Sequence, residues 1–255
     1  MSVFKEYAKY YDLLYKDKDY SQEISYIDSL IRNYTDKKDI IEFGCGSGLH
    51  AIELAKLGYS VFGLDISDAM ITQANDRLEK QHDNISNLLS FNIGDAKKYS
   101  GERKFNVALS LFHVISYMQT KNDLVNTFKT VNNSLNIGGL FLFDFWYGPG
   151  VLNDPPKKVS KYVTKQDLVI KRETIPFLNK TDRLVEVNFD LSINRDDIKI
   201  DTVQECHIMR YFFKDEMIEI LESNNFDVLY SKEWLTHKEL SKETWYACFL
   251  AKKIR

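Results

Sequence analysis

The stretch Ile40-Ile41-Glu42-Phe43-Gly44-Cys45-Gly46-Ser47-Gly48 decides the fold of this chain of 255 residues. It is a short apolar run that ends in a glycine-rich turn, after which a helix is expected from Leu49. A second apolar run, residues 59–64, ends in Asp65. Glycines let a backbone approach a ligand closely, and an acid at the end of the second strand can accept hydrogen bonds from both hydroxyls of a ribose. The spacing therefore predicts a crevice that binds a nucleoside.

The glycine spacing separates two classes of nucleoside-binding proteins. Nicotinamide-binding proteins carry a third glycine three positions after the second one, and this chain has Leu49 there. Gly44, Gly46 and Gly48 instead alternate directly behind an acid, Glu42. This acid-x-Gly-x-Gly-x-Gly pattern resembles the motif with which class I methyltransferases bind S-adenosylmethionine (SAM). SAM is therefore the expected cofactor.

The alternation of elements around this motif predicts an α/β fold. Between Asp39 and Trp146, short apolar runs alternate with amphipathic ones, as in a parallel sheet covered by helices. The expected strands are 40–43, 60–64, 88–93, 105–111, 140–145, 226–234 and 245–252, and the expected helices include 49–56, a helix capped by Ser67, 123–135 and 214–223. Together these strands would form a Rossmann-like sheet of seven strands, as in class I methyltransferases.

A segment of different character interrupts this pattern. Glycines and prolines over residues 148–156 end the alternation. Beyond them, apolar residues recur with period two, as at Val185, Val187 and Phe189, and turn residues separate the runs. This pattern predicts an inserted antiparallel sheet of three or four strands. We therefore divide the chain into a core of residues 1–150 and 205–255 and an insertion of residues 151–204, which would recognise the acceptor.

The composition argues against several classes of function. The formal net charge is −3, so no positive field recruits nucleic acid or an anionic membrane. Cys45, Cys206 and Cys248 lie far apart, which offers neither metal-ligand spacing nor a disulfide framework and fits a reducing cytoplasm. The N-terminal residues lack the apolar centre of a signal peptide, and no apolar run approaches the length of a membrane span. We expect a cytoplasmic protein with a small-molecule acceptor and no metal.

Acids at strand ends are the first candidate ligand contacts. Asp65 ends the second strand and Asp95 follows the third, and the carboxyl ends of such strands face one crevice. Asp65 would hold the ribose, and Asp95 with Ala96 would meet the adenine edge. Glu42 would complement the ammonium of the methionine part. The alternative is that each acid only caps the helix that follows it.

Tyrosines are concentrated near the N-terminus, at Tyr7, Tyr10, Tyr11, Tyr15 and Tyr20. In a helix, several of them share one face, which would pack the helix onto the core. The same rings could form a lid over the cofactor, because aromatic faces attract a sulfonium cation as they attract an ammonium. Both interpretations remain open, since one helix can do both.

The loop after the fourth strand is expected beside the reacting methyl group. His113 or Tyr117 in this loop could orient or deprotonate the acceptor, although an isolated histidine is more often structural. Residues 205–212 would place His207 and Arg210 on a strand that re-enters the core. His207 is a second candidate base. Arg210 would anchor a phosphate or carboxylate, or would pair with a surface acid.

Residues just beyond the fifth strand complete the candidate site. Trp146 and Tyr147 would form pocket walls, or would instead plug the edge of the sheet.

These motifs together are similar, over essentially the whole chain, to small-molecule SAM-dependent methyltransferases found with bacterial surface-polysaccharide and deoxysugar genes. The resemblance is to the N,N-dimethyltransferases of thymidine-diphosphate amino sugars in particular, and it rests on residues 11–20, the glycine turn, residues 111–118 and residues 143–149. It implies that Tyr11 and Tyr20 help to enclose SAM. The position of Tyr117 can be a histidine near the acceptor amine in that family, whereas this chain has its histidine at His113.

The resemblance predicts methyl transfer from SAM to the amine of a nucleotide-linked sugar. O-methylation of a glycan precursor or small metabolite is the nearer alternative, and non-catalytic SAM binding is the further one. The predicted cofactor contacts are Tyr11, Tyr20, Glu42, Gly44, Cys45, Gly46, Gly48, Asp65, Ile66, Met70, Asp95, Ala96 and Leu111; the predicted catalytic residues are His113, Tyr117 and His207; and the predicted acceptor contacts are Trp146, Tyr147 and Arg210. The insertion is also expected to support a homodimer.

Overall fold

The computed structural model describes residues 4–255. Its elements are, in chain order, α1 (Ala8–Leu14), α2 (Tyr20–Arg32), β1 (Asp39–Phe43), α3 (Leu49–Lys56), β2 (Ser60–Asp65), α4 (Asp68–Leu78), α5 (Asp83–Ser86), β3 (Leu89–Ile93), β4 (Phe105–Ser110), the 3₁₀ helix η1 (Val114–Tyr117), α6 (Lys121–Ser134), β5 (Leu135–Trp146), α7 (Gly148–Asn153), β6 (Val159–Lys165), β7 (Leu168–Asn179), β8 (Leu184–Arg195), β9 (Ile198–Arg210), α8 (Lys214–Ser223), β10 (Phe226–Glu233) and β11 (Tyr246–Lys253). The helices α2, α5 and α7 were not predicted from the sequence.

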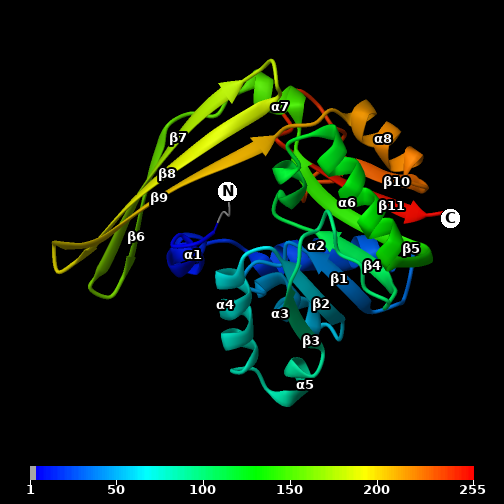
Figure 1. The fold of residues 1–255 in the computed structure, drawn as a ribbon, viewed down its shortest axis with the longest axis horizontal. Coiled ribbons are helices and arrows are strands. Elements are labelled where there is room, and N and C mark those ends of the chain that lie inside the picture. The colour runs from blue at the N-terminus through cyan, green and yellow to red at the C-terminus, as the bar shows by residue number, and fades with distance from the viewer. Residues whose placement is uncertain (1–3) are drawn as a thin grey trace.

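Seven strands form the central sheet in the order β10-β11-β5-β4-β1-β2-β3 (Figure 1). The five strands from β5 to β3 are parallel, whereas β11 runs antiparallel to both β5 and β10. The predicted seven-stranded α/β sheet is thereby confirmed. The strand order reverses beside β1, since β2 and β3 follow on one side and β4 and β5 on the other. In such a sheet the ligand crevice lies at this reversal, beyond the carboxyl ends of the strands.

Helices cover both faces of this sheet because successive strand residues point to opposite sides. Ile40 packs with α2, α3 and α4 on one face, and its neighbour Ile41 packs with α6 and α8 on the other. The same alternation continues in β5, where Leu142 joins the first cluster and Phe143 the second. Both faces are therefore buried, which explains why these strands read as continuous apolar runs.

The second sheet has the order β6-β7-β8-β9, is antiparallel throughout, and extends from the core as a wing (Figure 1). The predicted inserted sheet is thus present. Its last strand continues past Gln204, where the predicted insertion ends, as far as Arg210. A bridge between Tyr147 and Phe212 then ties the chain back to the central sheet.

Helix α1 joins the two sheets. Tyr7 and Leu14 are buried against Ile170 and Leu191 on the inner face of the wing, so α1 lies beside the carboxyl edge of the central sheet. Within residues 4–255, no helix combines the length and the apolar character needed to cross a membrane.

Candidate functional site

The glycine turn after β1 forms the floor of the site. The backbone N–H groups of Gly44 and Cys45 donate to the Leu64 carbonyl at 2.7 and 2.9 Å, which fixes the turn against the end of β2. Gly44 has a φ of +78°, and a Cβ there would lie 2.4 Å from Val114. Gly46 has a φ of +55° and open space around its absent Cβ. The turn therefore needs glycine, and at Gly46 it leaves bare backbone facing a cavity.

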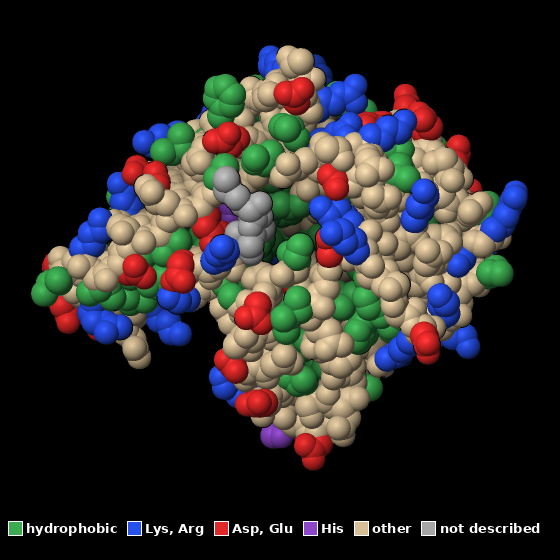
Figure 2. All heavy atoms as spheres, viewed as in Figure 1, with side chains coloured by type: hydrophobic (Ala, Val, Ile, Leu, Met, Phe, Trp, Pro, Cys, Tyr) green, Lys and Arg blue, Asp and Glu red, His purple; other side chains and the backbone are tan. Residues whose placement is uncertain are grey.

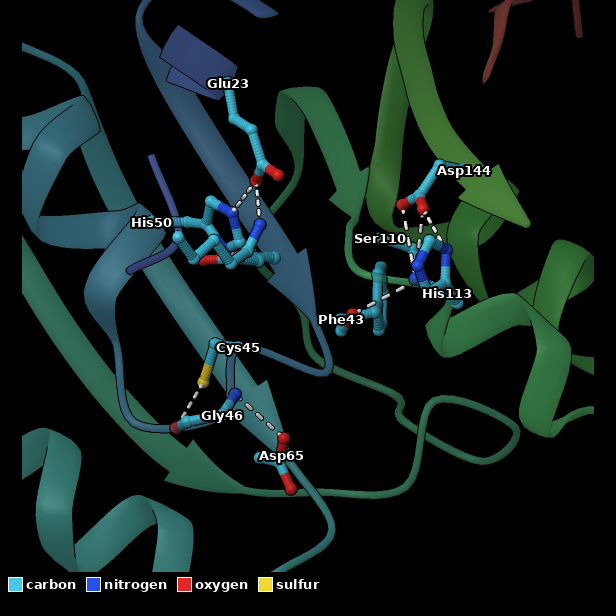
Figure 3. A network of polar contacts seen from close by, with 11 residues as sticks. Glu23, Phe43, Cys45, Gly46, His50, Asp65, Ser110, His113 and Asp144 are labelled. Carbon is cyan, nitrogen blue, oxygen red and sulfur yellow. Dashed lines mark hydrogen bonds and ion pairs between the residues drawn. The ribbon is translucent and has the colours of Figure 1, made fainter. Parts of the chain in front are cut away.

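Asp65 holds the turn and lines the cavity at the same time. Its carboxylate accepts the N–H of Gly46 at 2.9 Å (Figure 3) and that of Ser67 at 2.8 Å. Burial raises the pKa of Asp65, although these backbone hydrogen bonds act in the opposite direction. Each carboxylate oxygen can accept more than one hydrogen bond. The backbone contacts therefore do not exclude the predicted contact with a ribose.

Glu42 is a buried acid without a partner. Its side chain is fully buried, and neither carboxylate oxygen has a hydrogen-bond partner among the residues that the structure describes. Burial, with a further contribution from the charge of Asp65, raises the pKa of Glu42 to about 8. The His50 ring lies close by, with 3.9 Å between its Nδ1 and Oε1 of Glu42, but burial lowers the pKa of His50 and so disfavours its cationic form. A buried carboxylate of this kind suits a positively charged ligand group.

A polar network connects this floor to the N-terminal helices. The Nε2 atom of His50 lies 2.7 Å from Oε2 of Glu23, which also pairs with Lys18 (Figure 3). The Lys18 ammonium lies over the rings of Tyr20 and Phe112, at 4.8 and 4.5 Å from their centroids. His50 fastens α2 to the glycine turn, and it also lines the cavity.

One cavity collects residues from three parts of the chain. We call the core wall the lining residues Gly44, Cys45, Gly46, Ser47, Leu49, His50, Asp65, Met70, Leu111, Phe112, His113 and Val114; we call the insert wall Val187, Phe189, His207 and Met209. Between the two walls stand Phe4, Tyr7, Tyr11, Tyr15, Tyr20, Tyr117 and Trp146. Tyr7 packs beneath the wing and also lines the cavity, so the same ring has packing contacts and a position that a lid over the cofactor would need.

His113 is held rigidly in the loop after β4. Phe112 and His113 are both left-handed, with φ of 59° and 65°. The His113 ring has Nδ1 at 2.5 Å from Oδ2 of Asp144 (Figure 3). The same ring stacks on Tyr246 with 4.5 Å between centroids. The backbone N–H of His113 donates to the same carboxylate. Two consecutive left-handed residues are costly, and they persist where the surroundings fix them.

Tyr117 and His207, predicted separately, lie in direct contact. The Tyr117 hydroxyl is 2.7 Å from Nδ1 of His207, and Nε2 of His207 is 3.1 Å from the Glu205 carboxylate. Both rings line the cavity. This contact joins the loop after β4 to β9, which lie 90 positions apart in the sequence. No local pattern could reveal it.

Several predicted site residues lie elsewhere. Asp95 accepts the N–H of Lys97 at 2.9 Å within a turn, and β4 rather than a helix is the next element, so Asp95 does not have the helix-capping role weighed as its alternative. Arg210 pairs with Glu216 at 2.5 Å, which is the alternative interpretation of this residue. The predicted residues that are not among the described cavity-lining residues are Glu42, Gly48, Ile66, Asp95, Ala96, Tyr147 and Arg210. Ile66 is largely exposed and Tyr147 packs in the core, whereas Trp146 does line the cavity.

Of the residues on the insert wall, the sequence predicted only His207 as a site residue, whereas Val187, Phe189 and Met209 also line the cavity. Val187 and Phe189 belonged to the predicted period-two strand, but the pattern alone does not say which face of a sheet meets a ligand. Glu205 carried no signal at all. Within residues 4–255, no group of His, Cys, Asp and Glu side chains is arranged to hold a metal ion.

The site residues fit SAM as a cofactor. Gly46 offers bare backbone, Asp65 stands at the strand end, and Glu42 is an orphaned buried acid. Residues 40–139 match a protein family described as a methyltransferase domain.

Curated relatives extend this match. The dTDP-3-amino-3,4,6-trideoxy-alpha-D-glucopyranose N,N-dimethyltransferase of Streptomyces venezuelae is 28% identical over 152 residues, covering 58% of this chain and 61% of that protein. The dTDP-3-amino-3,6-dideoxy-alpha-D-glucopyranose N,N-dimethyltransferase of Streptomyces fradiae is 26% identical over 147 residues, covering 56% of this chain and 54% of that protein. The matched part thus spans little more than half the length of these relatives.

The fold likeness covers the whole chain. The crystal structure of the sugar N-methyltransferase KedS8 from Streptoalloteichus sp. ATCC 53650 superposes with a TM-score of 0.81 at 16% identity, covering 100% of this chain and 97% of that one. The resemblance in sequence is thereby confirmed by the family match and by the curated relatives. Residues 40–139 therefore carry a methyltransferase domain, and the chain is similar in sequence and in fold to amino-sugar N-methyltransferases.

Proposed function

We propose that this protein transfers a methyl group from SAM to the amine of a nucleotide-linked sugar. The observation that carries the proposal is the cavity between the core wall and the insert wall, because it joins a nucleoside-binding turn to the inner face of a second sheet. The relatives from Streptomyces are named for N,N-dimethylation of amino sugars linked to thymidine diphosphate, which supports the choice of acceptor.

The core wall would hold the cofactor. Asp65 would accept hydrogen bonds from the ribose. Glu42, which lies behind the lining residue His50, would attract the ammonium of the methionine part. Tyr11 and Tyr20 would cover the positive sulfur with their rings. When bound, SAM supplies a methyl group that its positive sulfur already activates. The residues of the chain then have to align the two reactants and exclude water.

The insert wall, on the inner face of the wing, would bind the acceptor. Tyr117 lies between this wall and the core wall, so its hydroxyl would receive a hydrogen bond from the acceptor amine. A neutral amine needs no strong base to attack a methyl group, and positioning supplies most of the acceleration.

The test begins with titration calorimetry of S-adenosylhomocysteine (SAH), which should bind with a dissociation constant in the micromolar range. SAM is then incubated with the two dTDP-linked amino sugars named for the relatives, and mass spectrometry follows the gain of methyl groups. N-acetylated versions of the same sugars should gain none, because the amide nitrogen is a poor nucleophile. Absence of SAH binding would contradict the proposal.

O-methylation is the second candidate, and the pairing of His113 with Asp144 favours it. An alcohol holds its proton more tightly than an amine, and a histidine oriented by a carboxylate is a suitable base. The change His113→Asn keeps a donor facing Asp144 and removes the base. We expect a loss in kcat of less than about tenfold on an amine, and of roughly 100-fold or more on an alcohol. Methylation of the N-acetylated sugars, lost in this variant, would decide for O-methylation.

We further propose that the protein acts on a small molecule, without nucleic acid or a membrane as partner, and that it works in the cytoplasm as a homodimer through the wing. Charges of both signs alternate over the wing on the face shown in Figure 2, without a large patch of one sign. All three cysteines are free thiols. Light scattering of the purified protein would test the dimer, with a monomer mass as the contradicting result.

A further inference from the structure

Glu205, His207 and Tyr117 form a hydrogen-bonded row that leads from the N-terminal segment into the cavity. Nε2 of His207 lies 3.1 Å from Oε2 of Glu205, and Nδ1 lies 2.7 Å from the Tyr117 hydroxyl. His207 is 1% exposed, so this row is shielded from water along its middle. The row connects β9 to the loop after β4 at the point where both line the cavity.

Glu205 also binds the start of the described chain. Its carboxylate accepts the backbone N–H groups of Phe4, Lys5 and Tyr7 at 2.9, 2.8 and 3.2 Å. Burial opposes ionisation, but the hydrogen bonds from His207 and from these amides lower the pKa of Glu205 below its usual value. Glu205 is therefore an anion, and every one of these neighbours must donate to it.

The charge of Glu205 fixes the direction of the hydrogen bonds beyond it. Because a carboxylate only accepts, Nε2 of His207 carries the proton that it donates to Glu205. In the imidazole tautomer with its proton on Nε2, Nδ1 is an acceptor. Burial raises the pKa of Tyr117 well above its usual value, so the phenol keeps its proton and donates it to Nδ1. The oxygen of Tyr117 is left with lone pairs for a donor in the cavity.

We propose that Glu205 is a positioning residue that, through His207, makes the Tyr117 oxygen a hydrogen-bond acceptor for the incoming amine, and that it fastens residues 4–7 over the same site. This inference rests on the proposed function and adds to it the chemistry that selects an N–H or O–H group as the acceptor. It also gives a reason for tyrosine at position 117, because the histidine of the row is His207 on β9, which contacts the Tyr117 hydroxyl.

The row can take up the proton that methyl transfer releases. The N–H bond of the acceptor breaks and its proton passes to the Tyr117 oxygen, while the proton of Tyr117 passes to Nδ1 of His207. His207 becomes an imidazolium whose Nε2–H still donates to the Glu205 carboxylate. One proton moves from the acceptor to His207, and no electron transfer or further reactant is required.

A double-mutant cycle with Glu205→Gln and Tyr117→Phe tests the inference. The amide introduced by Glu205→Gln can donate to Nε2, so the proton of His207 would move to Nδ1 and be donated to the Tyr117 oxygen. The Tyr117 O–H would then face the acceptor as a donor instead of offering it an acceptor. The assay measures kcat at saturating SAM with dTDP-3-amino-3,4,6-trideoxyglucose, and calorimetry measures SAH affinity. We expect each single change to lower kcat by roughly 10- to 100-fold. SAH affinity should stay within about threefold in Tyr117→Phe, because its ring remains in place.

The cycle separates a shared row from two independent effects. If Glu205 acts through Tyr117, the double variant has a kcat no lower than the worse single variant. Losses that multiply would show that Glu205 acts elsewhere and would overturn the inference. The control is Glu186→Gln, the same change at an exposed position of β8, which should leave kcat unchanged.

Two further results keep the outcomes distinct. If Glu205→Gln does not fold, Glu205→Asp replaces it in the cycle. Aspartate keeps a negative charge near the backbone amides, but its side chain is one methylene shorter, so its carboxylate lies farther from His207. The same non-additivity is expected. If the wild-type protein itself neither binds SAH nor methylates the sugar, the proposed function fails, whereas an active wild type with multiplying losses defeats only the role of Glu205.

Discussion

The core wall and the insert wall meet in one cavity but are built in different ways. The core wall comes from loops at the ends of neighbouring parallel strands, and its central contacts are between backbone and carboxylate, as at Gly46 and Asp65. The insert wall comes from side chains on the inner face of an antiparallel sheet, with His207 as its polar member.

This difference indicates where each wall can vary. The core wall depends on backbone geometry, and a Cβ at Gly44 would collide with Val114, so few sequences satisfy it. The insert wall depends on which side chains project from a regular strand, and these can change without altering the sheet. A fixed cofactor side and an adaptable acceptor side are what one would expect of enzymes that share a cofactor but differ in acceptor.

The change Asp65→Ala tests the core wall most severely. Two hydrogen bonds from ribose hydroxyls to a carboxylate would be lost, each worth about 1.5–3 kcal/mol. We expect SAH affinity to fall more than about 100-fold, which calorimetry would measure. Asp227→Ala, an exposed acid on β10, is the control and should bind as the wild type does. Retained SAH affinity in Asp65→Ala would place the ribose elsewhere.

The change Glu42→Gln tests whether the floor of the core wall carries an uncompensated acid. The pKa of Glu42 is raised to about 8 in the folded protein, from a usual value near 4.5. Below the usual value both states hold the proton, and as the pH rises from there to 8 the folded state is progressively disfavoured. Glu42→Gln cannot ionise, so relative to the wild type it should gain about 4 kcal/mol of stability at pH 8 but only about 1 kcal/mol at pH 5.

Denaturant unfolding at pH 5, 7 and 8.5, without ligand, measures this difference. The control is Glu53→Gln, a partly exposed acid on α3 that pairs with Lys56. Its stability should follow that of the wild type at each pH. A constant offset between Glu42→Gln and the wild type across the three pH values would contradict the raised pKa.

The change Phe189→Ala tests whether the two walls act separately. Phe189 packs against Tyr7 and His207 with ring centroids 5.2 and 5.0 Å apart. Its loss should raise the KM of the amino sugar by about tenfold, through lost apolar contact of 1–2 kcal/mol, and should leave SAH affinity within about threefold. The matched control is Phe177→Ala, an exposed ring on β7. Equal losses in both measurements would show that the walls bind one ligand jointly.

The smallest effect is expected at Arg210. Its guanidinium pairs with Glu216 and lies over the ring of Phe212 at 5.0 Å, so its charge is already used within the protein. Arg210→Ala should therefore change the KM of the nucleotide-linked sugar by less than about twofold. A tenfold rise in KM, reversed by Arg210→Lys, would restore Arg210 as an anchor for the phosphates.

The sequence by itself determined the central sheet and the glycine turn of the core wall. The period of apolar residues located its seven strands, and the alternation of glycines behind Glu42 indicated the turn, because both signals are local and depend on backbone geometry. Even the end of α8 at Ser223 was readable, since two asparagines follow it.

Only the tertiary structure decided how the remaining residues meet. It brought His207 to Tyr117 and Glu205 to the amides of residues 4–7, across 90 and about 200 positions of sequence. It also sent Arg210 to Glu216 and Asp95 to its own turn, away from the cavity. The physical reason is that strand periodicity specifies two faces but not their neighbours, and the wing acquires its inner face only by folding over α1.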